Sequence, residues 1–326
     1  MLKWAPLKSS FTPKKYKATI ILILLVVLVF TIFPLLNKKE LYQAQKILNS
    51  LSIEERKQIE WLFRNLFVQN ELGYTLFGDK PMSICWPNTL SPRFSNSNCT
   101  FKLYVEGTIP LYKALDVWKK IKQEIQTDNY SLIICEENQY PSFTILINKH
   151  AFVEQFNRNI DLFRRYYTKD ITADAIIASL QQKNDKSILA DRLFRNDILL
   201  GIMLGFGRHS AELFQRRLDL SSEDAEPPFL QHKIPSKGFC SIAEELQYLT
   251  QHLQTQSKTC EWYTNTFPLL LRVTTVAFAF DPDDPEAQLL ISKYKILHTK
   301  LTKIFDRSDW LEVVVTQLMS NQRVNA

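Results

Sequence analysis

The sequence predicts an α+β protein that is predominantly helical and carries one N-terminal transmembrane helix. Three observations support this fold class. A continuous apolar run covers residues 18–36. In the rest of the chain, apolar residues recur mostly at helical spacing, and only a few short runs have the composition of strands. Only 7 glycines occur among the 326 residues, which disfavours a glycine-rich barrel or sandwich.

The apolar run, ATIILILLVVLVFTIFPLL, is long enough to cross a bilayer as a helix. Its 19 residues span about 28 Å at roughly 1.5 Å per residue, close to the ~30 Å hydrocarbon core. The alternative is a cleaved signal peptide, because lysines precede the run. Cleavage needs small residues after the run, whereas bulky and charged residues, FPLLNKKEL, stand there. We therefore predict an uncleaved anchor that contacts the lipid bilayer through residues 18–36.

Flanking charge predicts the orientation of this anchor. Five lysines and no acidic residue precede it, so residues 1–17 are expected to form a basic cytoplasmic tail under the positive-inside rule. The same lysines suit contacts with anionic lipid headgroups. The globular part is therefore expected on the other side of the membrane.

Net charge disfavours nucleic acid as a partner. The formal net charge of +6 falls to +1 when the five N-terminal lysines are left out. A protein face that binds nucleic-acid phosphates normally gives its domain a basic excess. We therefore expect no nucleic acid, and we look to lipid and to other membrane or envelope proteins as partners.

Residues 37–70 are expected to form a helical stalk that joins the anchor to the body. Residues 40–49 would be a spacer, and Ser52 with Glu55 forms a capping box for the helix that follows. The apolar residues of that helix recur at i, i+3, i+4, i+7 and i+8 and predict a buried stripe: Ile59, Leu62, Phe63, Leu66 and Phe67.

Residues 71–168 are expected to form a small α/β module. Strand-like composition predicts three strands, of which the second and third form a hairpin: 101–105, 131–135 and 143–147. One helix begins at Thr108 and Pro110, and another has its apolar stripe between Phe152 and Phe163. The order β-α-β-β-α indicates a small mixed sheet covered by helices.

Residues 169–326 are expected to be mainly helical. Thr172, Asp185 and Asp284 occupy N-cap positions, and Asp309 with Glu312 predicts a further capping box. The helices are expected near 173–181, 188–204, 210–220, 241–256, 285–305 and 309–318. Residues 221–238 are polar and contain prolines, which indicates a loop or an internal boundary. Residues 269–280, LLLRVTTVAFAF, favour a strand, although a buried helix would have a similar pattern.

Four of the five cysteines can form two disulfides. Cys85 and Cys99 bracket a loop rich in Pro, Ser and Asn, and Cys240 and Cys260 bracket an expected helical hairpin. Two bridges would suit an oxidising compartment. The alternative is that all the cysteines are reduced and unrelated. Cys135 ends an apolar run and is expected to be a buried thiol.

Asp79 and Lys80 are the first candidate binding residues. They lie in the segment GYTLFGDKP, whose last four residues suit a tight turn in which Gly78 is free to take a positive φ. In the functional interpretation, the two side chains present opposite charges at a binding surface. In the structural alternative, the segment only turns the chain between two strands.

Arg208 and His209 are the second pair of candidates. In LGFGRHSAELFQRR, Gly205 and Gly207 precede a helix start, where backbone N–H groups and the two side chains can hold an anion. The G-K-[ST] ending of a P-loop is missing, so nucleotide binding is not predicted. The structural alternative is a tight corner between two helices, with the arginines facing solvent.

No motif predicts a metal, a cofactor or a specific reaction. The segment DPDDPE, residues 281–286, lacks the ligand spacing and central glycine of an EF-hand, so helix capping explains it better. The five histidines are scattered without H-E-x-x-H or C-x-x-C spacing, which gives no support to a zinc site. A G-x-S-x-G nucleophile elbow is also missing from the sequence. We therefore expect no metal and no cofactor.

The segments GYTLFGDKP and LGFGRHSAELFQRR, with the single N-terminal anchor, resemble an uncharacterised family of single-pass membrane-anchored proteins from intracellular bacteria. The resemblance implies no activity. It favours a location in the bacterial inner membrane, with a cytoplasmic N-terminus and a periplasmic globular part.

Two hypotheses about function follow from the sequence. The first is a non-enzymatic binding or scaffolding protein of the cell envelope, because the chain has an anchor and no reaction signature. The alternative is a membrane-tethered hydrolase with a cleft between the α/β module and the helical region. The alternative requires Asp79, Lys80, Arg208 and His209 to converge in that cleft.

Overall fold

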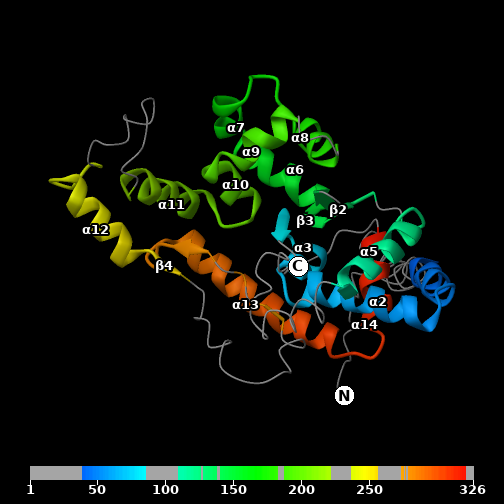
Figure 1. Ribbon diagram of the computed structural model, residues 1–326. Helices are drawn as coiled ribbons and strands as arrows, with labels where there is room; N and C mark the ends of the chain where they lie inside the picture. The colour runs from blue at the N-terminus through cyan, green and yellow to red at the C-terminus, as the bar shows by residue number, and fades with distance from the viewer. Residues whose placement is uncertain are drawn as a thin grey trace, which may run out of the picture.

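The computed structural model describes residues 39–85, 109–125, 128–137, 140–182, 187–221, 236–255 and 273–320, except 275 and 277. Within these ranges the protein is predominantly helical with a small antiparallel sheet, which confirms the α+β class (Figure 1). The expected anchor, residues 18–36, lies outside the described ranges. Inside them, every helix is too short or too polar to cross a bilayer.

A three-stranded sheet lies at the centre of the fold. β1 (Met82–Cys85) and β2 (Tyr130–Glu137) both pair with β3 (Tyr140–Asn148), in the order β1-β3-β2. The expected hairpin is confirmed by the antiparallel register of β2 and β3. The expected mixed sheet is wrong for the described strands, which are all antiparallel. A hairpin connection as short as that between β2 and β3 permits only antiparallel pairing. The strand expected at 101–105 lies outside the described residues.

The first hydrophobic core combines helices from both ends of the described chain. These are a helix over residues 39–49 and the following elements: α2 (Ile53–Phe63), the π-helix η1 (Arg64–Val68), α3 (Leu72–Phe77), α5 (Ile109–Ile121), α13 (Pro285–Phe305) and α14 (Trp310–Met319). The whole stripe predicted on α2 and η1 is buried, as expected. The helix over residues 39–49 buries Ala44, Ile47 and Leu48 in this core, so it packs on the body and is not a free spacer.

The second hydrophobic core lies on the opposite face of the sheet. It is built by consecutive helices: α6 (Lys149–Arg158), α7 (Ile160–Tyr166), α8 (Ala173–Gln181), α9 (Ile188–Phe194), α10 (Asp197–Met203) and α11 (Arg208–Ser221). Figure 1 shows α6 to α9 above the sheet, and α2, α13 and α14 below it. Along β3, Ile145 and Ile147 contribute to the second core, whereas Leu146 contributes to the first.

Capping residues explain where several helices begin. The Ser52–Glu55 box forms as predicted, with reciprocal backbone-to-side-chain hydrogen bonds of 3.2 and 3.0 Å. The box expected for Asp309 and Glu312 does not form. Asp309 instead binds the guanidinium of Arg307 at 2.6 Å, and Glu312 pairs with an arginine on α2. Charge-assisted pairs with arginine thus replace the bonds of the expected cap.

Two helices that the apolar pattern predicts as continuous are interrupted by asparagines. The run from 188 to 204 divides into α9 and α10, because the Asn196 side chain accepts the N–H of Leu199 at 2.9 Å and caps α10. Asn159 separates α6 from α7. Thr172 caps α8 as predicted, whereas Asp185 lies outside the described residues.

A peripheral unit lies beside α11. It consists of α12 (Ile242–His252) and a small sheet of β4 (Gln254–Thr255) and β5 (Ala279–Phe280). The guanidinium of Arg216 on α11 binds Glu245 on α12 through two hydrogen bonds of 2.8 and 2.7 Å. The Glu245 side chain is only 2% exposed, so this ion pair is a main attachment of α12 to α11.

Among the described cysteines, Cys85 is buried, Cys135 is half-buried and Cys240 is exposed. Cys99 and Cys260, the partners expected for disulfides, lie outside the described residues. Cys85 is packed in the first core, and burial raises the pKa of its thiol to about 12. A thiol with this pKa stays protonated at neutral pH and is unreactive. Because one partner of each pair lies outside the described residues, the two expected disulfides stay predictions.

Acid should loosen the attachment of α12 to α11. Hydrogen bonds from Arg216 and from Ser236 lower the pKa of Glu245 to about 2, from an ordinary value of 4.5. Because this pKa is lower in the folded state, the ionised carboxylate stabilises the fold fully above pH 4.5. The contribution is lost as the pH falls from 4.5 towards 2. We expect hydrogen exchange of the α12 amides, corrected for intrinsic rates, to accelerate across this range.

The control for this prediction is Glu245→Gln, which removes the titrating group. In this variant the α12 amides should exchange fast already at pH 7, with little further change in acid. The α8 amides, in the second core, should keep their protection in both proteins. Equal pH profiles for α12 in the variant and the parent protein would contradict the assignment to Glu245.

Candidate functional site

The two glycine-containing segments singled out in the sequence lie against each other. GDKP connects α3 to β1, so the expected position between two strands is wrong, and residues 204–207 connect α10 to α11. A Cβ atom placed on Gly205 would lie 3.3 Å from Lys80 Cγ and from Pro81 Cδ. The hydroxyl of Tyr294, on α13, donates to the carbonyl of Gly205 at 2.7 Å. We call this meeting point the junction; it consists of Glu71, Lys80, Gly205, Phe206 and Tyr294.

Lys80 is fully buried in the junction. Its ammonium forms an ion pair with Glu71, which is partly exposed, and lies 5.4 Å from the ring centroid of Phe206. The Phe206 ring stacks in turn on Phe278, with centroids 5.3 Å apart. A buried ammonium needs such partners because an unpaired buried charge costs several kcal/mol. The Lys80 side chain is therefore not available to a ligand from solvent.

Tyr294 is the hydrogen-bond donor that closes the junction. Burial raises the pKa of its phenol, and the carboxylates of Glu71 and Asp79 raise it further. The phenol therefore stays protonated at all physiological pH values and donates to Gly205. This bond connects α13, of the first core, to the corner between α10 and α11, of the second core.

The glycines in and beside the junction have different roles. Gly205 and Gly207 have φ of 76° and 82°, which the corner between two helices requires and which other residues rarely adopt. Gly78, which we expected to take a positive φ, has φ of −127°. Glycine is needed at residue 78 for a different reason: a Cβ there would lie 2.3 Å from Leu297 Cδ2 on α13.

Asp79 does not pair with Lys80. Its carboxylate binds the ammonium of Lys293, on α13. The opposite charges of the two candidates are thus each paired with a different residue of the protein. The expected charged pair at a binding surface is wrong, because burial of Lys80 requires Glu71 as its partner.

Arg208 and His209 contact different carboxylates. The Arg208 guanidinium lies 2.9 Å from both Asp161, on α7, and Glu212, on α11. His209 Nε2 lies 3.6 Å from Asp281 Oδ2, just after β5. Three carboxylates near these two side chains repel an anion, so the geometry disfavours the expected anion site. The structural alternative, a tight corner between two helices, fits the positive φ of both glycines.

The four candidate side chains therefore act mainly within the protein. Each has a carboxylate or an ammonium of the chain as its partner, and the one at the centre, Lys80, has no exposed surface. Their segments meet, but the charged groups bind separate partners: Glu71 just before α3, and residues on α7, α11, α13 and the β5–α13 loop. The arrangement joins the two cores.

No family model matches the chain, and no curated protein or solved structure matches it. The resemblance to membrane-anchored proteins of intracellular bacteria stays a prediction. The function must therefore be argued from the surfaces and side chains of this structure.

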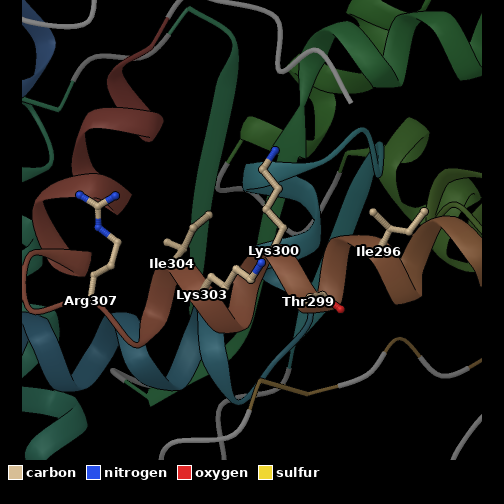
Figure 2. Close-up of a pocket in the computed structure, with 6 residues that line it drawn as sticks. All are labelled: Ile296, Thr299, Lys300, Lys303, Ile304 and Arg307. Carbon is tan, nitrogen blue, oxygen red and sulfur yellow. The ribbon is translucent and has the colours of Figure 1, made fainter.

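A groove with a volume of about 530 Å³ lies along the outer face of α13 (Figure 2). It is lined by Ile296, Thr299, Lys300, Lys303, Ile304 and Arg307. Ile296 at its end is 74% exposed, and Leu289, two helical turns earlier, is 70% exposed. Figure 2 shows the lining side chains spaced along the helix, with the three cationic groups at separate positions around the aliphatic ones.

This surface was not identified from the sequence, although a signal was present. Leu289 and Ile296 are seven residues apart and share a face that differs from the buried stripe of Tyr294, Leu297 and Leu301. An apolar pair on the polar side of an amphipathic helix is the pattern that marks this surface in the sequence.

Proposed function

We propose that the protein is a membrane-anchored, non-enzymatic binding or scaffolding protein of the bacterial cell envelope, with the groove on α13 as its binding surface. The observation that supports this function best is the exposed apolar and basic face of α13. A groove beside two large exposed aliphatic side chains is typical of interaction sites. The anchor at residues 18–36 would hold the groove near other membrane-bound proteins and raise their effective concentration.

The chemistry of the groove indicates its partner. α13 carries four lysines and one glutamate, and the groove adds Arg307. Such a surface favours an acidic segment, since opposite charges speed association and select the partner. The exposed Leu289 and Ile296 require apolar side chains on the same partner. We therefore propose an acidic amphipathic segment of another envelope protein as the occupant of the groove.

A membrane-tethered hydrolase, with its cleft between the α/β module and the helical region, is the weaker proposal. Its support was the convergence of Asp79, Lys80, Arg208 and His209. In the structure these residues have separate partners within the chain, and Lys80 is buried. A binding function requires none of them to reach a substrate.

Photocrosslinking from the groove tests the proposed function. A benzophenone amino acid at Ile296 of the full chain, expressed in cells, should give one discrete adduct in the membrane fraction. The same amino acid at Ile53, which is 80% exposed on α2, should give none. The adduct should decrease at least fivefold when Lys300 and Lys303 are both replaced by Glu, because an acidic partner is then repelled.

Three results would contradict the proposal. If the crosslinker at Ile296 gives only monomer, as at Ile53, the groove is not a binding surface. If the full chain is recovered in the soluble fraction, and deletion of residues 18–36 does not change this, these residues do not anchor the protein. A lipid adduct in place of a protein adduct would contradict the proposed occupant.

A further inference from the structure

A second group of polar side chains lies where α11, α12 and the loop from β5 to α13 meet, at the left of Figure 1. One donor atom each from His252, Asp281 and Asp283 lies within 4.8 Å of the other two. The shortest of these contacts, 3.1 Å, joins His252 Nε2 to Asp283 Oδ2. His209 Nε2 approaches the Asp281 carboxylate from α11 at 3.6 Å. Three donor groups from α12 and the β5–α13 loop thus converge on one place, and His209, an exposed side chain on α11, lies against one of them.

These distances suit a tetrahedral metal ion. Bonds of about 2.0–2.2 Å to nitrogen and oxygen place neighbouring ligands of a tetrahedron about 3.3 Å apart. The two His-to-Asp contacts, 3.1 and 3.6 Å, bracket this separation. The Asp283 side chain is 82% exposed, so it can rotate to shorten the longer separations without disturbing the core.

The donor set selects the kind of metal. Two imidazoles and two carboxylates combine nitrogen and oxygen ligands, which zinc accepts, whereas calcium and magnesium prefer oxygen alone. The charges also fit, because a divalent cation balances two carboxylates.

Two neighbouring contacts hold the ligands in place. The backbone N–H of Asp283 donates to Asp281 Oδ1 at 2.9 Å, which leaves Oδ2 directed to His209. The Tyr248 ring stacks on the imidazole of His252, with centroids 4.5 Å apart. Contacts that fix the orientation of ligands in this way increase metal affinity.

We propose that His209, His252, Asp281 and Asp283 bind one zinc ion. Four protein ligands leave no open position for substrate, so the ion has a structural role. It fastens α12 and the β4–β5 sheet to the start of α11 and α13. The site lies on a different surface from the groove on α13. It is independent of the proposed binding function.

Metal binding by the full chain without an affinity tag tests the proposal. After dialysis against zinc and then against buffer, elemental analysis should find one zinc per chain. Cobalt(II) in its place should give the strong visible absorption of a tetrahedral site. His209→Ala and His252→Ala should each weaken zinc binding tenfold or more in competition with a chelator, and His150→Ala, an exposed histidine on α6, should not.

Asp283→Asn provides a variant with little risk of misfolding, since this side chain is largely exposed. It should also weaken zinc binding, with an unchanged circular dichroism spectrum. The proposal is overturned if the parent chain retains no zinc, or if binding survives unchanged in the folded His252 and Asp283 variants. It is equally overturned if His150→Ala lowers the amount of zinc per chain as much as the His252 and Asp283 variants do.

Discussion

Replacing Glu71 with Gln should lower the free energy of unfolding by about 3–5 kcal/mol, because the ammonium of Lys80 then stays buried without a counter-charge. Gln has nearly the shape of Glu, so water gains little access to Lys80. The Lys80 side chain has no exposed surface, and the ring of Phe206 alone offsets only part of the desolvation. Urea unfolding of the full chain, followed by fluorescence and circular dichroism, measures the change.

Three comparisons separate the ion pair from a general effect of the substitution. Glu60→Gln removes the partly exposed pair between Glu60 on α2 and Arg64 on η1 and should cost less than about 1 kcal/mol. Lys80→Met should cost less than Glu71→Gln, because Glu71 is partly exposed and remains hydrated. Combining Lys80→Met with Glu71→Gln should recover stability relative to Glu71→Gln alone. If Glu71→Gln costs no more than Glu60→Gln, the ion pair does not stabilise the junction.

Features determined by neighbours in the sequence could be predicted. The capping box of Ser52 and Glu55 needs only two residues three positions apart, and the apolar stripe that follows it needs only helical spacing. The β2–β3 hairpin is local in the same sense. Asn196 shows the limit of this reasoning, since its side chain can cap a new helix inside an otherwise continuous apolar pattern.

Features that depend on distant partners could not be predicted. Asp79 and Lys80 are adjacent in sequence, yet their partners are Lys293 and Glu71. A tight turn looks the same in sequence whether its lysine is exposed or buried, because the residues that cover Lys80 come from the distant corner between α10 and α11. The sequence singled out two segments that meet in the fold, but it could not show which residues their charged side chains bind.

The proposed zinc ligands illustrate the same limit. Motif spacing recognises a metal site only when its ligands share a helix or a loop. His209, His252 and Asp281 come from three segments that the fold brings together. Histidines that are scattered in the sequence are therefore weak grounds for excluding a metal.

Replacing Gly205 with Ala should lower the free energy of unfolding by about 3 kcal/mol. The φ of 76° costs a residue with a Cβ about 1–2 kcal/mol. The new Cβ would also lie 2.6 Å from the hydroxyl oxygen of Tyr294, and overpacking of this kind costs about 1–3 kcal/mol. The substitution should push the α10–α11 corner away from α13. The two cores should therefore unfold less cooperatively in urea.

Gly238→Ala isolates the first contribution. Gly238 has a positive φ of 106°, but a Cβ there meets no atom within 4 Å, so only backbone strain of about 1–2 kcal/mol is expected. Tyr294→Phe isolates the second, because it removes the oxygen that the new methyl group would meet. In the double variant, Gly205→Ala with Tyr294→Phe, the loss should be smaller than the sum of the single losses. Additive losses, or equal losses at Gly205 and Gly238, would mean that the phenol of Tyr294 does not hold the two cores together.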